Sequence, residues 1–219
     1  MEIQFLRERE CHELQQAFER LQHPVHLFLF LATDQDEYGA IISGLLDELV
    51  SLHPYLSQER RTMSTDAALM SALGIDKTPA IMVLGGHDRA DYNIRFYGLP
   101  SGHTFSLLIE VILMVGGAVP IPLQPETQQF LAQLSSPRHM KVFITAANGA
   151  CPPAVLRAYG MAHASPYIDI EVVEVLAFPQ LSARYTVRYT PTTVINEQIV
   201  IEGEISEREL LDYLRLAPA

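Results

Sequence analysis

Two turns of the same kind recur along the chain, and the second contains a cysteine, the side chain that could do thiol chemistry. The first reads Asp36-Glu37-Tyr38-Gly39 and the second reads Asn148-Gly149-Ala150-Cys151, 112 residues later. Each turn follows an apolar, strand-like run and precedes a helical pattern. Disulfide exchange needs two sulfurs, because one thiolate attacks and a second thiol resolves the mixed disulfide. Neither turn has two cysteines, so the sequence predicts no dithiol chemistry at either of them.

A Thr-Pro dipeptide follows each turn at the same interval. Thr78-Pro79 lies in IDKTPAIMVL and Thr190-Pro191 lies in VRYTPTTVIN, and these two are again 112 residues apart. Two kinds of landmark that share one offset indicate an internal duplication. Each copy reads as helix, strand, helix, strand, helix, Thr-Pro strand, strand and helix.

The segment GGAVPIPLQP at residues 116–125 separates the two copies. Its glycine pair is typical of a helix end, and its three prolines prevent the helix from continuing. We therefore expect two domains, residues 1–117 and residues 118–219. Because domains of about 100 residues are common, 219 residues are enough for two.

Composition excludes several classes of function. The net charge of −11 and the absence of a basic cluster argue against a nucleic-acid partner. No uncharged apolar run reaches the length of a membrane span, and the charged N-terminus does not resemble a secretory signal. Two cysteines cannot form a disulfide framework. We therefore expect a cytoplasmic protein without a membrane partner.

The sequence gives no support for a metal or a bound cofactor. The eight histidines are scattered, whereas a structural zinc site needs four ligands with short paired spacings. Gly85-Gly86 fits a hairpin turn better than a phosphate-binding loop. We expect neither kind of group to be needed.

The stretches FYGLPSGHTF and CPPAVLRAYGMAHA and the two Thr-Pro strands carry a resemblance to a known family. A βαβ unit, a helix and a closing ββα unit, with Thr-Pro before the third strand, resemble the thioredoxin fold. Two such units, each with an extra N-terminal helix, are similar to the tandem glutaredoxin-like protein disulfide oxidoreductases. The plan is also similar to the paired thioredoxin folds of bacterial alkyl hydroperoxide reductase flavoproteins. The resemblance implies an α/β fold of two tandem thioredoxin-like domains, each a mixed β-sheet flanked by helices.

That family has Cys-x-x-Cys at the strand-to-helix turn, so this chain resembles a degenerate member. In the register that the 112-residue offset favours, Asp36 and Asn148 stand at the attacking position, where either could cap the helix, and Cys151 stands at the resolving position. A resolving cysteine is shielded and behaves as a small apolar residue. In a second register the motif begins at Cys151, which would then be a lone attacking thiol at the helix start. Cys11 lies on the apolar stripe of the first helix and is expected in the core.

In the family the proline is cis, and the backbone of the residue before it pairs with an extended peptide, which is a form of strand addition. The resemblance therefore implies substrate-binding positions at both turns. These are Asn148, Thr190 and Pro191 in the second half, and Asp36, Tyr38, Thr78 and Pro79 in the first.

Two hypotheses about function follow. The leading one is a non-catalytic module that binds an extended peptide or a partner protein beside Pro79 or Pro191, without a cofactor. The alternative is a single-thiol, glutathione-linked thiol-disulfide oxidoreductase that uses Cys151. The exposure and reactivity of Cys151 distinguish the two, because only an accessible thiolate is a nucleophile.

Overall fold

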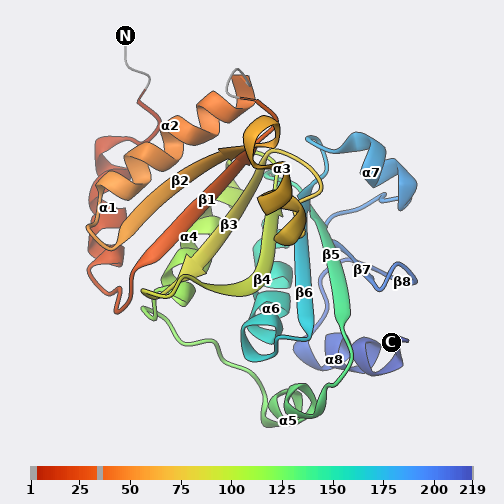
Figure 1. Ribbon diagram of the computed structural model, residues 1–219. Helices are drawn as coiled ribbons and strands as arrows, with labels where there is room; N and C mark the ends of the chain where they lie inside the picture. The colour runs from red at the N-terminus through yellow and green to blue at the C-terminus, as the bar shows by residue number, and fades with distance from the viewer. Residues whose placement is uncertain (1–3, 34–36, 219) are drawn as a thin grey trace. The chain divides into compact units, whose positions relative to one another are not determined.

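The computed structural model describes residues 4–33 and 37–218 (Figure 1). Contacts along the chain divide it into two compact units. Unit 1 comprises Met1–Asp91 and Ile109–Pro120, and unit 2 comprises Tyr92–Leu108 and Ile121–Ala219. The segment 92–108 thus groups with unit 2, although it precedes the Gly-Pro-rich segment in sequence. The domain boundary expected after Gly117 stays a prediction.

Unit 1 is built on a strand that is apolar throughout. β1 (Val25–Leu31) pairs in parallel with β2 (Leu56–Thr62) and antiparallel with β3 (Ala80–Gly85). β1 reads VHLFLFL and is almost entirely buried, as a strand covered on both faces should be. The helices before β3 are α1 (Glu8–Phe18), α2 (Glu37–Ser51) and α3 (Met63–Ala72).

Unit 2 has a longer mixed sheet. Its strands lie in the order β4 (Ala90–Tyr97), β6 (Ile168–Glu174), β5 (Arg138–Ile144), β7 (Thr192–Ile195) and β8 (Ile199–Glu202). β6 is parallel to both of its neighbours, whereas β7 is antiparallel to β5 and to β8.

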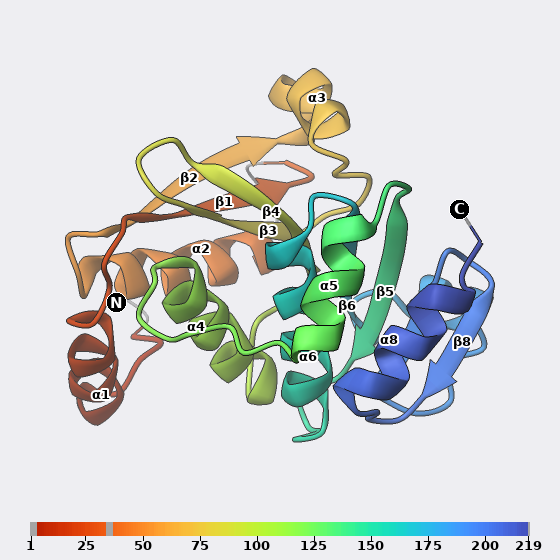
Figure 2. The same ribbon diagram turned by 90° about the horizontal axis from the view of Figure 1, so that it is seen from below.

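The helices of unit 2 flank this sheet. Figure 2 shows α5, α6 and α8 next to one another beside β5 and β6. The helices of the second half are α5 (Pro125–Gln133), α6 (Cys151–Ala164), α7 (Pro179–Arg184) and α8 (Glu207–Leu216), and α4 (His103–Val115) contains residues of both units. The predicted α/β fold with mixed sheets and flanking helices is confirmed.

Two local predictions are also tested. The peptide bonds Thr78-Pro79 and Thr190-Pro191 are both cis, as the resemblance implied. Within the described ranges, no helix combines the length and the apolar character needed to cross a membrane.

A polar network lies on one face of the unit 2 sheet. His139 on β5 stands opposite Asp169 on β6, with 2.7 Å between Nδ1 and the Asp169 carboxylate. Its Nε2 is 3.0 Å from an oxygen of Glu171. Burial by itself would lower the pKa of His139, and the charge of Lys141 acts in the same direction. The hydrogen bonds to the two carboxylates outweigh both and raise the pKa to about 9.

A buried hydroxyl in the core of unit 2 has no hydrogen-bond partner. Tyr159 on α6 is fully buried, and its ring packs against the His163 ring at 6.0 Å between centroids. Within the described residues its hydroxyl oxygen forms no hydrogen bond. By contrast, the hydroxyl of Tyr185 donates to the carboxylate of Glu197. Burial of an unpaired hydroxyl costs about 1–3 kcal/mol.

The His139 network predicts a pH dependence of stability. The folded-state pKa of about 9 lies above the ordinary value of 6.5. The stabilisation is therefore fully present below pH 6.5 and is lost as the pH rises toward 9. His139→Gln should lower the free energy of unfolding most at the acid end of this window, and the difference from wild type should shrink toward alkaline pH. Denaturant titrations across the window measure it. A difference that does not change with pH would contradict the assignment.

Tyr159 and Tyr185 give a matched pair of substitutions. Tyr159→Phe should raise the free energy of unfolding by about 1 kcal/mol, because it removes a buried, unpaired hydroxyl. Tyr185→Phe should lower it by about 1 kcal/mol, because it removes a donor from Glu197. Urea denaturation of both variants gives the two signs. A loss of stability in Tyr159→Phe would show that its hydroxyl has a partner.

Candidate functional site

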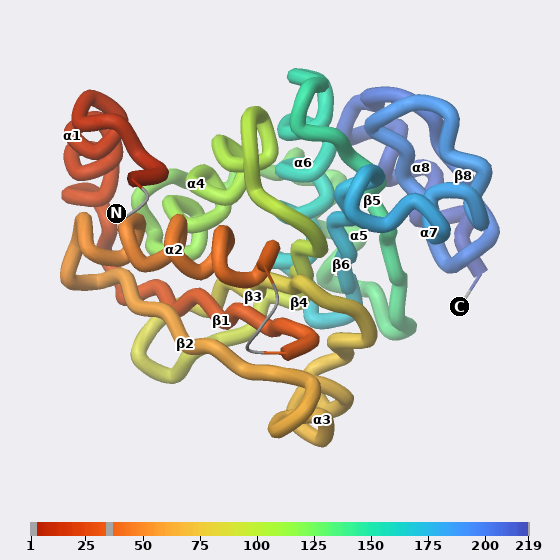
Figure 3. Tube along the Cα trace, turned by 90° about the horizontal axis from the view of Figure 1, so that it is seen from above, coloured from red at the N-terminus to blue at the C-terminus, as the bar shows by residue number. Residues whose placement is uncertain are grey.

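The second turn lies at the carboxyl edge of β5. The pairing of Phe143 with Thr192 brings the start of β7 to this edge, and the pairing of Ile144 with Glu174 brings the end of β6 there. The chain between β5 and α6 can be followed in Figure 3 where the colour passes from green to teal. Three segments that are distant in sequence therefore meet beside the turn.

The side chain of Asn148 forms two hydrogen bonds in opposite directions. Its Oδ1 accepts from the backbone N–H of Ala150 at 3.0 Å, which closes a turn of the Asx type. Its Nδ2 donates to the carbonyl oxygen of Thr190 at 2.5 Å. The first bond lies in the turn before α6, since Ala150 holds the N-cap position of the helix, so the expectation that Asn148 caps the helix itself is corrected. The second bond joins the turn to the Thr-Pro loop.

Cys151 is buried at the start of α6. It is the first residue of the helix and not one turn into it, and its exposed fraction is 0%. Its thiol lies against the backbone of Thr145 and the side chain of Thr190. Burial raises the pKa of the thiol, and the hydrogen bonds from these two residues only partly offset it. A buried thiol with a raised pKa is a poor nucleophile. The burial is what a resolving position implies, although the place in the helix matches the second register.

Three further residues belong to this edge, and none of them was predicted from the sequence. Tyr189 directly precedes Thr190 and is 67% exposed, and Leu176, two residues beyond β6, is 79% exposed. The ring of His103 lies against Gly149, where a Cβ atom would be 3.4 Å from its Cε1. Tyr189 could have been inferred from its place beside Thr190. The sequence contains no signal that places Leu176 or His103 here.

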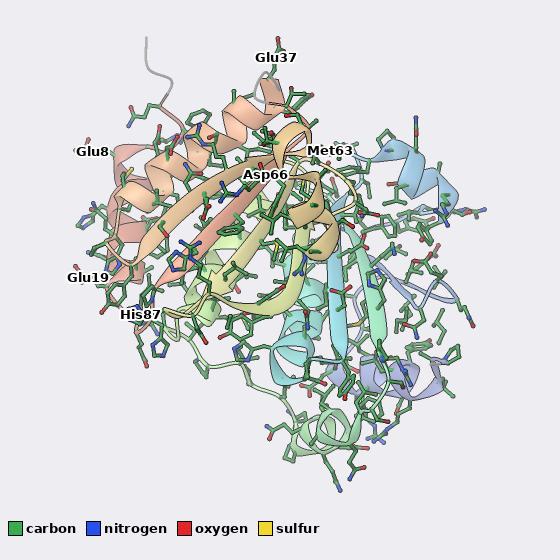
Figure 4. The ribbon with its side chains drawn as sticks, in the orientation of Figure 1. Glu8, Glu19, Glu37, Met63, Asp66 and His87 are labelled. Atoms are coloured by element: carbon green, nitrogen blue, oxygen red, sulfur yellow. The ribbon has the colours of Figure 1, made fainter. Side chains whose placement is uncertain are left out.

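The first turn is assembled less fully. Asp36 lies outside the described residues. Tyr38, in the first turn of α2, is 65% exposed, and Thr78 and Pro79 are both partly exposed. In the part of the chain that the structure describes, no hydrogen bond joins Tyr38 to Thr78. Figure 4 shows Glu37 at the start of α2. Among the predicted positions that the structure describes, a hydrogen bond joins turn and Thr-Pro loop in unit 2, between Asn148 and Thr190.

Metal binding has no candidate site among residues 4–33 and 37–218. No group of three or more histidine, cysteine or acidic side chains is placed to hold a metal ion there. Cys11, on α1, is a free cysteine that is partly exposed and not fully in the core as expected.

The burial of Cys151 predicts its reactivity. In a Cys11→Ser background, the native protein should react with iodoacetamide at pH 7 much more slowly than the unfolded protein, roughly a hundredfold, because the thiol is inaccessible and protonated. Labelling followed by mass spectrometry measures both rates. Equal rates in the native and unfolded states would show that Cys151 is an exposed nucleophile.

The position of Asn148 predicts the result of restoring a second sulfur. In the same Cys11→Ser background, Asn148→Cys should form an intramolecular disulfide with Cys151 on mild oxidation, because the two positions flank one turn. Intact-mass measurement should show a loss of about 2 Da, since disulfide formation removes two hydrogens. Glu202→Cys, on β8 of the same unit, is the control and should not form such a disulfide. Absence of the mass change in Asn148→Cys would contradict the register in which Asn148 stands at the attacking position and Cys151 at the resolving position.

Comparisons with known proteins identify the same fold. Residues 138–215 match the family model described as "Thioredoxin domain". The N-terminal NTD_N/C domain of alkylhydroperoxide reductase AhpF from Enterococcus faecalis superposes with a TM-score of 0.87 at 26% identity, covering 96% of this chain and 100% of that chain. A protein disulfide oxidoreductase from Aeropyrum pernix has a TM-score of 0.87 at 24% identity, over 97% of this chain and 94% of that one.

Curated relatives are longer than this chain. An alkyl hydroperoxide reductase protein of Staphylococcus aureus is 23% identical over 202 residues, which are 92% of this chain and 36% of the relative. A protein named NADH dehydrogenase from Ferdinandcohnia aciditolerans is 23% identical over 88% of this chain and 34% of its own length. The chain thus spans about a third of the length of these relatives. It is a tandem thioredoxin-like protein, similar to the AhpF N-terminal domain and to the Aeropyrum pernix oxidoreductase, with two cysteines and no Cys-x-x-Cys pair.

Proposed function

We propose that this protein is a non-catalytic module that binds an extended peptide, or an extended segment of a partner protein, along Thr190 in unit 2. One observation carries the proposal. In the described part of the chain, the backbone N–H of Thr190 donates no hydrogen bond, and Thr190 is partly exposed. An unpaired backbone donor beside a strand is the group that strand addition uses.

Apolar surface at the same edge of the sheet supports the same proposal. Tyr189, which directly precedes Thr190, and Leu176, which follows β6, are among the most exposed large apolar side chains of unit 2. A peptide laid along Thr190 would cover part of this surface, and each square ångström of apolar area removed from water contributes about 25 cal/mol. Affinity would then come from the backbone of Thr190 and from the Tyr189 side chain, without any reacting group.

The chemistry of the related oxidoreductases is not proposed for this chain. Cys151 is the only sulfur at its turn, and it is buried with a raised pKa. The single-thiol alternative would need a thiolate at Cys151 that can reach glutathione, and burial opposes both requirements. The proposed function therefore needs no cofactor.

The remaining parts of the proposal come from the sequence. We place the protein in the cytoplasm, with no nucleic-acid or membrane partner, in keeping with its net charge of −11 and the absence of a basic cluster. Binding beside Pro79 in unit 1 belongs to the same proposal, with fewer contacts to support it.

A catalytic assay tests the negative half of the proposal. The full chain should not accelerate the reduction of insulin disulfides by dithiothreitol above the rate without protein, because no turn carries two sulfurs. Turnover by the wild type that is lost in Cys151→Ser would overturn the non-catalytic function and favour the single-thiol alternative.

A binding experiment tests the positive half. The full chain is used to select from a displayed library of random 12-residue peptides, and the enriched peptides are synthesised and titrated. Tyr189→Ser should weaken their binding by about tenfold, because it removes an aromatic contact beside Thr190. Tyr213→Ser removes an exposed tyrosine from α8 and is the matched control, which should bind as wild type does. Failure to enrich any peptide, or equal loss in both variants, would contradict the proposed site.

A further inference from the structure

The backbone of Thr190 offers a donor while its acceptor is already in use. The carbonyl oxygen accepts from Nδ2 of Asn148 at 2.5 Å, whereas the N–H has no partner in the described ranges. In a hydrogen-bonded antiparallel pair, two residues exchange both of their N–H···O bonds. A peptide residue opposite Thr190 could therefore accept a hydrogen bond from the Thr190 N–H, but the Thr190 carbonyl oxygen would already be bonded to Asn148.

The orientation of the Asn148 amide is fixed by its neighbours. Its Oδ1 faces the N–H of Ala150 and its Nδ2 faces the carbonyl oxygen of Thr190. If the amide were turned by 180°, an oxygen would face the Thr190 oxygen and an NH₂ group would face the Ala150 N–H. Both contacts would be repulsive, so the hydrogen-bond network allows one orientation only. The group that faces the Thr190 carbonyl oxygen is therefore the NH₂ group of Asn148, a hydrogen-bond donor.

We propose that this arrangement selects a peptide that presents a proline opposite Thr190; the inference rests on the proposed function. Proline has a carbonyl acceptor for the Thr190 N–H and no N–H of its own. Any other residue brings an N–H that must share the Thr190 oxygen with Asn148 or stay unpaired, and an unpaired N–H in an interface is costly. Since a carbonyl oxygen has two lone pairs, sharing is possible, and the expected preference is about five- to tenfold in affinity.

The surroundings of Thr190 fit the same ligand. Proline-rich segments adopt the extended polyproline II conformation before binding, and they dock against exposed aromatic side chains. Tyr189 directly precedes Thr190 and supplies such an exposed ring. The hydrogen-bond polarity and the apolar surface thus point independently to one class of peptide.

Two substitutions at Asn148 remove the hydrogen-bond donor to the Thr190 carbonyl oxygen and leave the rest of the site in place. Asn148→Asp keeps an acceptor for the Ala150 N–H and nearly the same shape, but it removes the donor to Thr190. Asn148→Ser also keeps an acceptor for the turn and adds no charge. Asn196→Asp is the matched control, because Asn196 likewise accepts from one backbone N–H, that of His139, and donates to one carbonyl oxygen, that of Pro218.

The experiment uses the random 12-residue peptide library described above and the full chain. Peptides enriched by the wild type should contain a common proline, and its replacement by alanine should weaken binding by about five- to tenfold. In Asn148→Asp and Asn148→Ser the same replacement should change binding less than about twofold, because the Thr190 oxygen is then free to accept. Asn196→Asp should behave as the wild type.

The outcomes separate this inference from the function on which it rests. Enriched peptides without a common proline, or a proline preference that persists in both Asn148 variants, would overturn the inference and leave the peptide-binding function in place. A wild type that enriches no peptide would overturn the function, and the inference would fall with it.

Discussion

The hydrogen bond from Asn148 to the carbonyl of Thr190 is the constraint on which the candidate site depends. It joins the turn after β5 to the loop before β7, which are 42 residues apart in sequence. The Asx turn to Ala150 holds the other end of the same side chain. With both ends fixed, the backbone of Thr190 has a fixed position and a fixed hydrogen-bond polarity. Tyr189, which is exposed, and Pro191, which is buried, flank Thr190 directly.

The environment of Cys151 at the same turn opposes the formation of a thiolate. A thiolate beside a helix N-terminus is stabilised by backbone N–H groups and by nearby hydroxyls. Cys151 does contact Thr145 and Thr190, but burial outweighs them and raises the pKa of its thiol. Beside it Asn148 stays neutral and directs its own hydrogen bonds at the backbone. The groups that would stabilise a thiolate at this turn thus contact a buried sulfur whose pKa is raised.

Much of the fold could be predicted, because its signals are local. VHLFLFL has the pattern of a buried strand and forms β1. Ser206 and Glu209 have the spacing of a capping box, and they form one at the start of α8. The duplication was predicted from turn residues, but its offset is not constant along the chain. β1 begins at Val25 and β5 at Arg138, an offset of 113, so the strands are displaced by one residue relative to the Thr-Pro loops. A shift of one residue moves every side chain of a strand to the opposite face of the sheet. A single offset therefore could not predict both the strand faces and the positions of the Thr-Pro loops.

The parts that could not be predicted depend on contacts between distant segments. The pairing of β4 with β6 has no local signature, and neither does the placement of His103 against Gly149. The hydrogen bond from Asn148 to Thr190 could not be predicted either. Each residue is a common turn residue, and nothing in the local sequence indicates that the two are paired across 42 residues. Together they leave the backbone N–H of Thr190 without a partner among the described residues. Because an amide side chain does not titrate and is not oxidised, the polarity of that edge should be independent of pH and redox state, unlike that of a cysteine pair.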